Sequence, residues 1–263
     1  MSIDRMLSLA AGVVLDVDPP TAVDVAADTG WDAVGLWFDP ATWTAATTAA
    51  VARRLRDSAI VALDIEPVIL GRGPDPGDAL IDTAGELGVR HVLVGSGPAD
   101  RSAVVARFAE LCERAAPHGI TVVLEFLPIF TIGSLAAARS VVEEVAHPSG
   151  AVLVDTLHLS RSGGSPDDLK AMPAQLLPYL QLADATAEPA DPTPAGLREE
   201  ALHGRLLPGD GVLPLAETLA ILPGIPLSVE LRSRALMVDH PDASERSRIV
   251  LDATRRLLDT VPR

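Results

Sequence analysis

Short β-branched, apolar runs recur along this chain, and each is followed by an amphipathic stretch with helical periodicity. The first seven runs begin 26 to 31 residues apart, close to the length of one strand–helix unit. This alternation is typical of a parallel sheet, and eight units favour closure into a (β/α)8, or TIM, barrel over an open doubly wound sheet. We place the strand starts near Leu7, Ala33, Ile60, His91, Thr121, Ala151, Pro178 and Pro226.

The whole chain, residues 1–263, fits one TIM-barrel domain of the α/β class, because about 250 residues is the usual length of such a barrel. Only the spacing between the seventh and eighth runs is much longer, at 48 residues. It contains a polar, proline-rich segment at about 185–211, which we expect to be a long loop. Loops that follow barrel strands surround the active-site end, so this one is a candidate lid, and a plain surface excursion is the alternative.

Composition argues against several classes of protein. A net charge of −15 repels a phosphate backbone, and 3% aromatic residues offer few surfaces for base stacking, so we expect no nucleic-acid partner. No apolar run reaches the roughly 20 residues that cross a bilayer, and Asp16 and Asp18 interrupt the one that could imitate a signal peptide. The single cysteine, Cys112, cannot form an internal disulfide, and its helical setting predicts a buried side chain. We therefore expect a cytoplasmic protein with no membrane partner.

Four polar residues stand at the ends of consecutive predicted strands. Glu125 ends the fifth strand, Asp155 the sixth and Glu230 the eighth, and Gln181 lies on the seventh. In a barrel, such positions face the C-terminal mouth, where barrel active sites lie. Any one of the acids, taken alone, could instead cap a helix or pair with an arginine. Four together make coincidence less credible.

Three carboxylates buried side by side without a cation would cost several kcal/mol per charge. We therefore expect one divalent metal ion per chain, held by Glu125, Asp155, Gln181 and Glu230. Oxygen ligands favour Mg²⁺ or Mn²⁺, while Co²⁺ and Zn²⁺ are alternatives.

This constellation resembles the sugar phosphate isomerase/epimerase-like, or xylose isomerase-like, family of TIM barrels, and the resemblance covers nearly the whole chain. The family carries a Glu after the fifth strand, Asp-x-x-His after the sixth, His or Gln before x-x-Asp on the seventh, a Pro-Gly-x-Gly turn, and a Glu on the eighth. The matching residues here are Glu125, Asp155 with His158, Gln181 with Asp184, Pro208 to Gly211, and Glu230. Many epimerases have His where Gln181 stands. Glutamine there looks like the hydroxypyruvate isomerase branch and also like some 3-dehydroshikimate dehydratases.

The resemblance also implies residues that bind substrate. His158 corresponds to a histidine that hydrogen-bonds substrate oxygens, and Arg205 to an arginine that contacts the substrate. Arg161 and Arg232 lie near the same rim, where surface ion pairs are the plainer expectation. Glu66, which we expect to end the third strand, is a candidate to orient a substrate hydroxyl.

The resemblance implies that Glu125 and Glu230 act as catalytic acid and base as well as ligands. Proton abstraction beside a carbonyl would give a metal-stabilised enediolate. Return of the proton gives isomerisation or epimerisation of a small sugar-like or hydroxypyruvate-like compound, which we favour. Loss of a β-hydroxyl would instead make the enzyme a lyase, such as a 3-dehydroshikimate or inosose dehydratase.

Two further hypotheses are weaker. An endonuclease IV-like nuclease needs a histidine-rich zinc site and a basic face, and the sequence offers neither. A non-catalytic binding barrel is hard to reconcile with the four polar strand ends. The family resemblance also allows a homo-oligomer.

Overall fold

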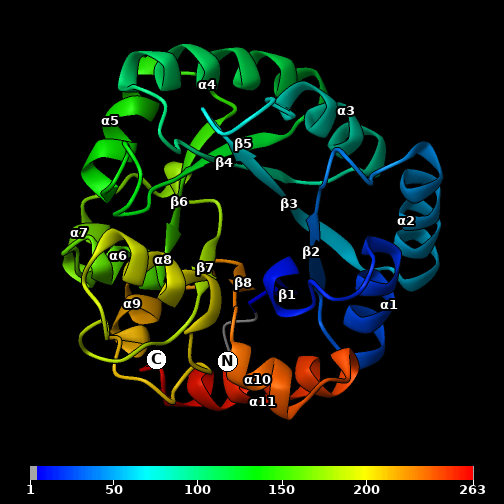
Figure 1. Cartoon of the computed structure of the whole chain (residues 1–263), viewed down its shortest axis with the longest axis vertical. Helices are drawn as coiled ribbons and strands as arrows, with labels where there is room; N and C mark the ends of the chain where they lie inside the picture. Colours follow the sequence, from blue (N-terminus) through cyan, green and yellow to red (C-terminus); the bar gives the residue numbers. More distant parts are fainter. Residues whose placement is uncertain (1–4, 263) are drawn as a thin grey trace.

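Eight parallel strands close into a barrel in the computed structural model, which describes residues 5–262 (Figure 1). The strands are β1 (Leu7–Leu9), β2 (Ala33–Trp37), β3 (Val61–Ile69), β4 (His91–Gly95), β5 (Thr121–Glu125), β6 (Gly150–Asp155), β7 (Leu180–Leu182) and β8 (Leu227–Val229). Each strand pairs with the next, and β8 closes the barrel on β1 with Ser228 opposite Ser8. The predicted (β/α)8 fold is confirmed.

Each predicted strand start lies within two residues of the observed one, because the apolar, β-branched runs are the buried strands themselves. The end of the third strand was predicted wrongly. Strand β3 does not stop at Glu66 but continues to Ile69, and its pairing with β4 is irregular between Ile65 and Val68. Glu66 therefore lies inside the strand.

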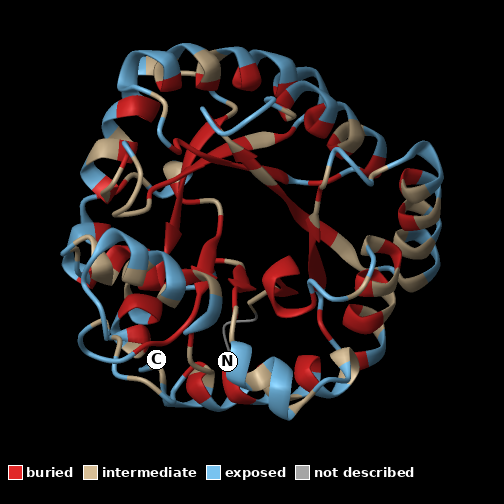
Figure 2. Ribbon diagram, viewed as in Figure 1, coloured by how far each residue is buried: buried red, intermediate tan, exposed pale blue. Residues whose placement is uncertain are grey.

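Helices form a ring around the barrel, and most of them have buried residues on the sides that face the strands (Figure 2). Local signals in the sequence set their ends. Asp18, for example, caps the first helix by accepting a hydrogen bond from the Thr21 amide at 2.8 Å, and Gly30 ends that helix with φ of 90°. The α-helices are α1 (Pro19–Thr29), α2 (Ala45–Ser58), α3 (Gly77–Leu87), α4 (Arg101–Ala115), α5 (Leu135–Val145), α6 (Thr156–Arg161), α7 (Pro166–Lys170), α8 (Pro194–His203), α9 (Leu215–Ile221), α10 (Arg234–Asp239) and α11 (Ala243–Thr260). Short 3-10 turns are η1 (Ala11–Val13), η2 (Ala116–His118) and η3 (Ala174–Leu176).

The segment at 185–211 is not loop throughout, as the sequence had suggested, because it contains α8. Thr193 caps this helix by accepting a hydrogen bond from the Gly196 amide at 3.2 Å, and Pro194 occupies its first turn. Pro189 and Pro192 precede the helix and Pro194 occupies its first position, where proline is tolerated, while Pro208 follows it. The rest of the helix consists mostly of good helix formers.

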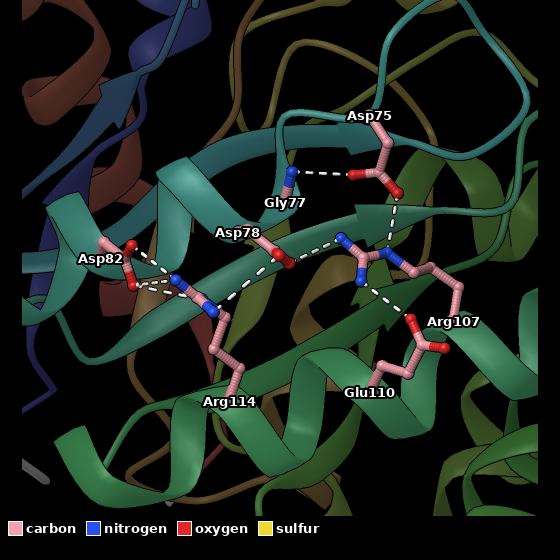
Figure 3. A network of polar contacts seen from close by, with 7 residues as sticks. All are labelled: Asp75, Gly77, Asp78, Asp82, Arg107, Glu110 and Arg114. Atoms are coloured by element: carbon pink, nitrogen blue, oxygen red, sulfur yellow. Dashed lines mark hydrogen bonds and ion pairs between the residues drawn. The ribbon is translucent and has the colours of Figure 1, made fainter.

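An arginine-centred network joins two neighbouring helices on the outside of the barrel (Figure 3). Arg107 of α4 pairs with Asp75 at 2.8 Å and with Asp78 of α3 at 2.7 Å, and Arg114 pairs with Asp82 at 2.6 Å. These pairs are partly exposed, so each contributes only about 0–1 kcal/mol, but together they fix α3 against α4.

Below the mouth, Leu63, Leu93, Val123 and Leu153 pack together. Cys112 is a buried free thiol, as predicted, and burial raises its pKa to about 12. Among residues 5–262, no helix combines the length and the apolar character needed to cross a membrane.

Candidate active site

Four buried polar residues lie at the C-terminal ends of adjacent strands. Glu125 and Asp155 end β5 and β6, Gln181 lies on β7 directly opposite Asp155, and Glu230 follows β8. Their exposed fractions are 8%, 0%, 1% and 4%. The structure therefore brings the four predicted metal ligands to one end of the barrel, on neighbouring strands.

The Asp155 carboxylate is held by three hydrogen bonds. Its Oδ1 accepts from the amides of Leu157 at 2.7 Å and His158 at 3.1 Å, which caps α6, and its Oδ2 accepts from Nη1 of Arg205 at 2.5 Å. Burial alone would raise the Asp155 pKa, but the Arg205 guanidinium and the other contacts outweigh it, and the pKa lies below its usual range. Asp155 thus both caps a helix and pairs with an arginine. A carboxylate has about four acceptor positions, so one stays free on Oδ2.

Arg205 is a buried cation, 4% exposed, that links three elements at the mouth. Besides Asp155, its Nη1 donates to the backbone carbonyl of Glu230 at 3.2 Å, and its Nε donates to the carbonyl of Ala201 in α8 at 2.9 Å. Burial would lower the pKa of Arg205, but the neighbouring Asp155 and Glu230 raise it. The guanidinium is therefore charged and fixed in place.

Asp184 explains why the family motif joins an aspartate to a Pro-Gly-x-Gly turn. Its carboxylate accepts hydrogen bonds from the amides of Gly209 and Leu213, each at 3.0 Å. A Cβ at Gly211 would lie 2.3 Å from Oδ1 of Asp184, so the turn needs glycine there. Asp184 and Leu206 also exchange backbone hydrogen bonds, which positions the preceding Arg205. Asp184 is a positioning residue for this loop.

Glu125, Asp155 and His158 each offer one ligand atom within 4.8 Å of the others. Burial and then the negative charge of Asp155 raise the pKa of Glu125 to about 8, while burial lowers the pKa of His158 to about 4. The imidazole is therefore neutral near pH 7 and able to coordinate a metal. The sequence had given His158 only a substrate-binding role, and its place in this cluster adds metal ligation as an alternative.

Further buried oxygen atoms lack a hydrogen-bond partner within the described residues. They are Oε1 of Gln181, Oε2 of Glu230 and Oε1 of Glu66. Unpartnered buried oxygens are costly, and a cation is the natural compensation. Carboxylates, one amide oxygen and one imidazole form a donor set that fits a divalent metal ion.

Asp64 is a buried acid near the site that the sequence reasoning missed. It lies on β3 two residues before Glu66, is fully buried, and has no partner among the described residues for either carboxylate oxygen. A Cβ at Gly35 would lie 3.1 Å from both oxygens, so glycine leaves room for them. Burial and then the negative charge of Glu230 raise the pKa of Asp64 to about 7. The signal that could have revealed Asp64 in the sequence is an acidic residue in the middle of an apolar run.

A cavity of about 320 Å³ opens at this end of the barrel. Six predicted site residues line it: Glu66, Glu125, His158, Gln181, Arg205 and Glu230. Trp37, at the end of β2, forms part of its wall. The sequence did not point to Arg72, Phe130 and Arg198, which also line it, because they lie in loops or on α8.

The other two rim arginines differ from each other. Arg161 pairs with Glu200 at 2.7 Å and does not line the cavity. Arg232 lines it, donates to Oε1 of Glu230 at 3.2 Å, and lies over the Trp37 ring at 4.9 Å. The expected ion pairs are present, and only Arg232 belongs to the site.

This chain belongs to the xylose isomerase-like TIM barrel family, whose sequence profile matches residues 23–256. The resemblance inferred from the strand-end motif is therefore confirmed. No protein with a curated description matches the sequence.

Solved structures with the same fold include enzymes of several kinds. The IolI protein with a bound zinc atom is 18% identical, with a TM-score of 0.84 over 98% of this chain and 99% of that one. A probable 3-DHS dehydratase, AsbF of Bacillus anthracis, is 16% identical, with a TM-score of 0.75 over 95% and 99%. A D-allulose 3-epimerase of Methylomonas sp. is 18% identical, with a TM-score of 0.68 over 96% and 98%.

A fourth match is longer than this chain. It is a fusion of a xylose isomerase-like barrel with 4-hydroxyphenylpyruvate dioxygenase, 22% identical with a TM-score of 0.81, and this chain covers 42% of it. At these identities the likenesses establish the fold alone.

Proposed function

We propose that this protein is a divalent-metal-dependent isomerase or epimerase of a small hydroxy-carbonyl compound. The observation that carries the proposal is that two buried carboxylates, Glu125 and Glu230, line one cavity from β5 and from the end of β8. A pair of carboxylates facing one substrate can remove a proton from carbon on one side and return it on the other.

Without a bound metal ion, burial and the charge of Asp155 raise the pKa of Glu125 to about 8, so this carboxyl group can exchange a proton near neutral pH. In the proposed step, a carboxylate takes the proton from the carbon beside the carbonyl, and the C–H electron pair moves into the carbonyl group to give an enolate. The charged Arg205 and the neutral His158 line the same cavity and can hydrogen-bond substrate oxygens. Burial excludes water from these groups and strengthens their interactions.

Glu125, Asp155, Gln181 and Glu230 would hold the metal ion, and His158 is an additional candidate ligand. When bound, the ion supplies positive charge that stabilises the negative charge developing on the carbonyl oxygen. Arg205 orients Asp155, and the hydrogen bond from Arg232 orients Glu230.

The fate of the enolate separates the leading function from the alternative. Return of the proton to the neighbouring carbon gives isomerisation, and return to the opposite face gives epimerisation. If a β-hydroxyl leaves as water, the enzyme is a lyase. Gln181 supports this alternative, because it resembles the residue of some 3-dehydroshikimate dehydratases, and a dehydratase is among the enzymes that share the fold.

Exchange of carbon-bound hydrogen with solvent tests the shared step. We would incubate the protein with saturating Mn²⁺ in D₂O together with dihydroxyacetone, which is neutral, or hydroxypyruvate, which is anionic, and follow deuterium uptake by mass spectrometry. We expect uptake by the wild type and a fall on the order of 10²-fold or more in Glu230→Gln or Glu125→Gln. Glu86→Gln is the matched control, because Glu86 is exposed on α3.

Undiminished exchange in both active-site variants would exclude these carboxylates as proton carriers. Loss of exchange in Glu86→Gln would show that the assay reports stability rather than chemistry. A new ultraviolet absorption from a conjugated product would favour the lyase.

A further inference from the structure

The cavity has an inner acidic part and an outer part with free positive charge. Four arginines line it: Arg72, Arg198, Arg205 and Arg232. Their convergence is notable in a chain of net charge −15. A ligand that enters this cavity meets two kinds of arginine, paired and unpaired.

The two inner arginines are already engaged with carboxylates of the site. Arg205 pairs with Asp155, and Arg232 pairs with Glu230 and lies over Trp37. The charges of these two arginines are largely balanced by those of the acids. The arginines therefore hold the carboxylates of the reacting centre in position.

The two outer arginines have no such partner. Within residues 5–262, neither Arg72 nor Arg198 forms an ion pair, and neither side chain donates a hydrogen bond to another residue. Arg72, in the loop after β3, has its guanidinium 5.7 Å from the centre of the Phe130 ring, and Arg198 lies on α8. Free guanidiniums at a cavity rim suit a carboxylate or phosphate.

The wall beside these arginines is mostly apolar, with Ile69, Leu127, Ile129, Phe130 and Leu202 lining it. Phe130 is tightly placed, because a Cβ at Gly95 would lie 2.9 Å from its ring. A sugar carrying a hydroxyl on every carbon would leave several of those hydroxyls without partners along this wall. The wall therefore suits a substrate whose carbon skeleton is flatter and carries fewer hydroxyl groups.

We propose that the substrate is a small organic anion, whose carboxylate or phosphate binds Arg72 and Arg198 while its hydroxy-carbonyl end meets Glu125 and Glu230. This inference rests on the proposed function and narrows its substrate class. It favours an anionic compound with an apolar or planar middle over a neutral, fully hydroxylated sugar.

Binding of matched anionic and neutral probes tests the proposal without turnover. We would titrate the purified protein with benzoate, benzamide and phenyl phosphate by calorimetry at fixed ionic strength of 0.1 M. We expect at least one of the two anions to bind at least about 10-fold more tightly than benzamide, since one charge-assisted contact accounts for such a factor. The stronger of the two anions identifies the group that the site takes.

The double variant Arg72→Met/Arg198→Met should reduce this preference to within about threefold, and both side chains are exposed, so it should fold normally. Arg53→Met/Arg56→Met is the matched control, because both arginines are exposed on α2, lie outside the cavity, and their replacement removes the same two positive charges. Equal binding of anion and amide, absence of binding by all three probes, or an undiminished preference in the double variant would overturn the proposal. Continued deuterium exchange with dihydroxyacetone or hydroxypyruvate would then leave the proposed function intact, whereas absence of exchange with both compounds, together with a retained anion preference, would reject only that function.

Discussion

Nη1 of Arg205 lies 2.5 Å from Oδ2 of Asp155, and both side chains are almost completely buried. The pair joins the end of β6 to the segment that follows α8, where Arg205 lies. Arg205 also donates to the carbonyl of Ala201 in α8 itself. The same aspartate is a predicted metal ligand, so one residue connects the metal centre to the segment beside the cavity. A change in either partner should therefore affect both stability and metal binding.

Arg205→Met should destabilise the protein by roughly 3–5 kcal/mol, because it leaves the Asp155 charge buried and unpaired. Urea unfolding at pH 7 in the presence of a chelator measures this loss. Mn²⁺ should restore part of the stability if Asp155 is a ligand, since a cation replaces the guanidinium. In Asp155→Asn/Arg205→Met the loss should be smaller than the sum of the single losses. A loss below about 1 kcal/mol for Arg205→Met would contradict a buried ion pair.

Metal binding at pH 7 should release close to one proton from Glu125. Glu125 has a pKa of about 8, so its carboxyl group is mostly protonated without metal and must ionise to become a ligand. Asp155 is already ionised and His158 already neutral, so neither adds a proton. Calorimetry in two buffers of different ionisation enthalpy measures the release, which should decline as the pH rises above 8. Glu125→Gln should lower the release by close to one proton, and an equal release in that variant would assign the proton elsewhere.

The sequence predicted the barrel because its signals are local. Short β-branched, apolar runs and the helical patterns between them act over a few residues, and strand order follows from the alternation itself. The mouth residues Glu125, Asp155, Gln181 and Glu230 were predictable for the same reason, since each ends or lies on a buried run and the barrel fixes which end those runs share.

What the sequence could not predict depends on contacts between distant segments. Arg205 lies 50 residues from Asp155, and only the turn wrapped around Asp184 places it there. Arg72 reaches the cavity from a loop and Arg198 from α8. No periodic pattern in these parts of the sequence indicates which way their side chains point. Helix α8 was not predicted because the prolines before it indicated a loop.

Thr193→Ala should loosen α8 and, with it, one wall of the cavity. Loss of the cap costs about 0.5–2 kcal/mol of helix stability. Amide hydrogen exchange in 194–203 should therefore become faster. Because Arg198 and Leu202 line the cavity from this helix, ligand binding should weaken too if, as we propose, the 185–211 segment acts as a lid. Thr193→Ser retains the capping oxygen and is the control; equal exchange in the two variants would mean that the cap does not hold the helix.

His91, inside the barrel at the start of β4, should make the protein sensitive to mild acid. Burial and, to a smaller degree, the charge of Arg90 lower its pKa from 6.5 to about 4. The native state therefore disfavours the charged imidazole, and below pH 6.5 the unfolded chain takes up a proton that the native chain does not. The stability contributed by neutral His91 is thus present above about pH 6.5 and is lost as the pH falls towards 4.

His91→Phe isolates this effect, because phenylalanine keeps a ring against Tyr179, whose centre lies 4.9 Å from that of His91, and removes the titrating group. Between pH 7.5 and pH 5, the unfolding free energy of the wild type should fall by about 2 kcal/mol more than that of the variant, since 1.5 pH units below 6.5 correspond to that difference. Urea titrations at the two pH values measure both changes. Glu125 and His158 titrate in both proteins, so their contributions cancel in the comparison. Parallel declines in the two proteins would mean that His91 is protonated as readily in the folded barrel as in the unfolded chain.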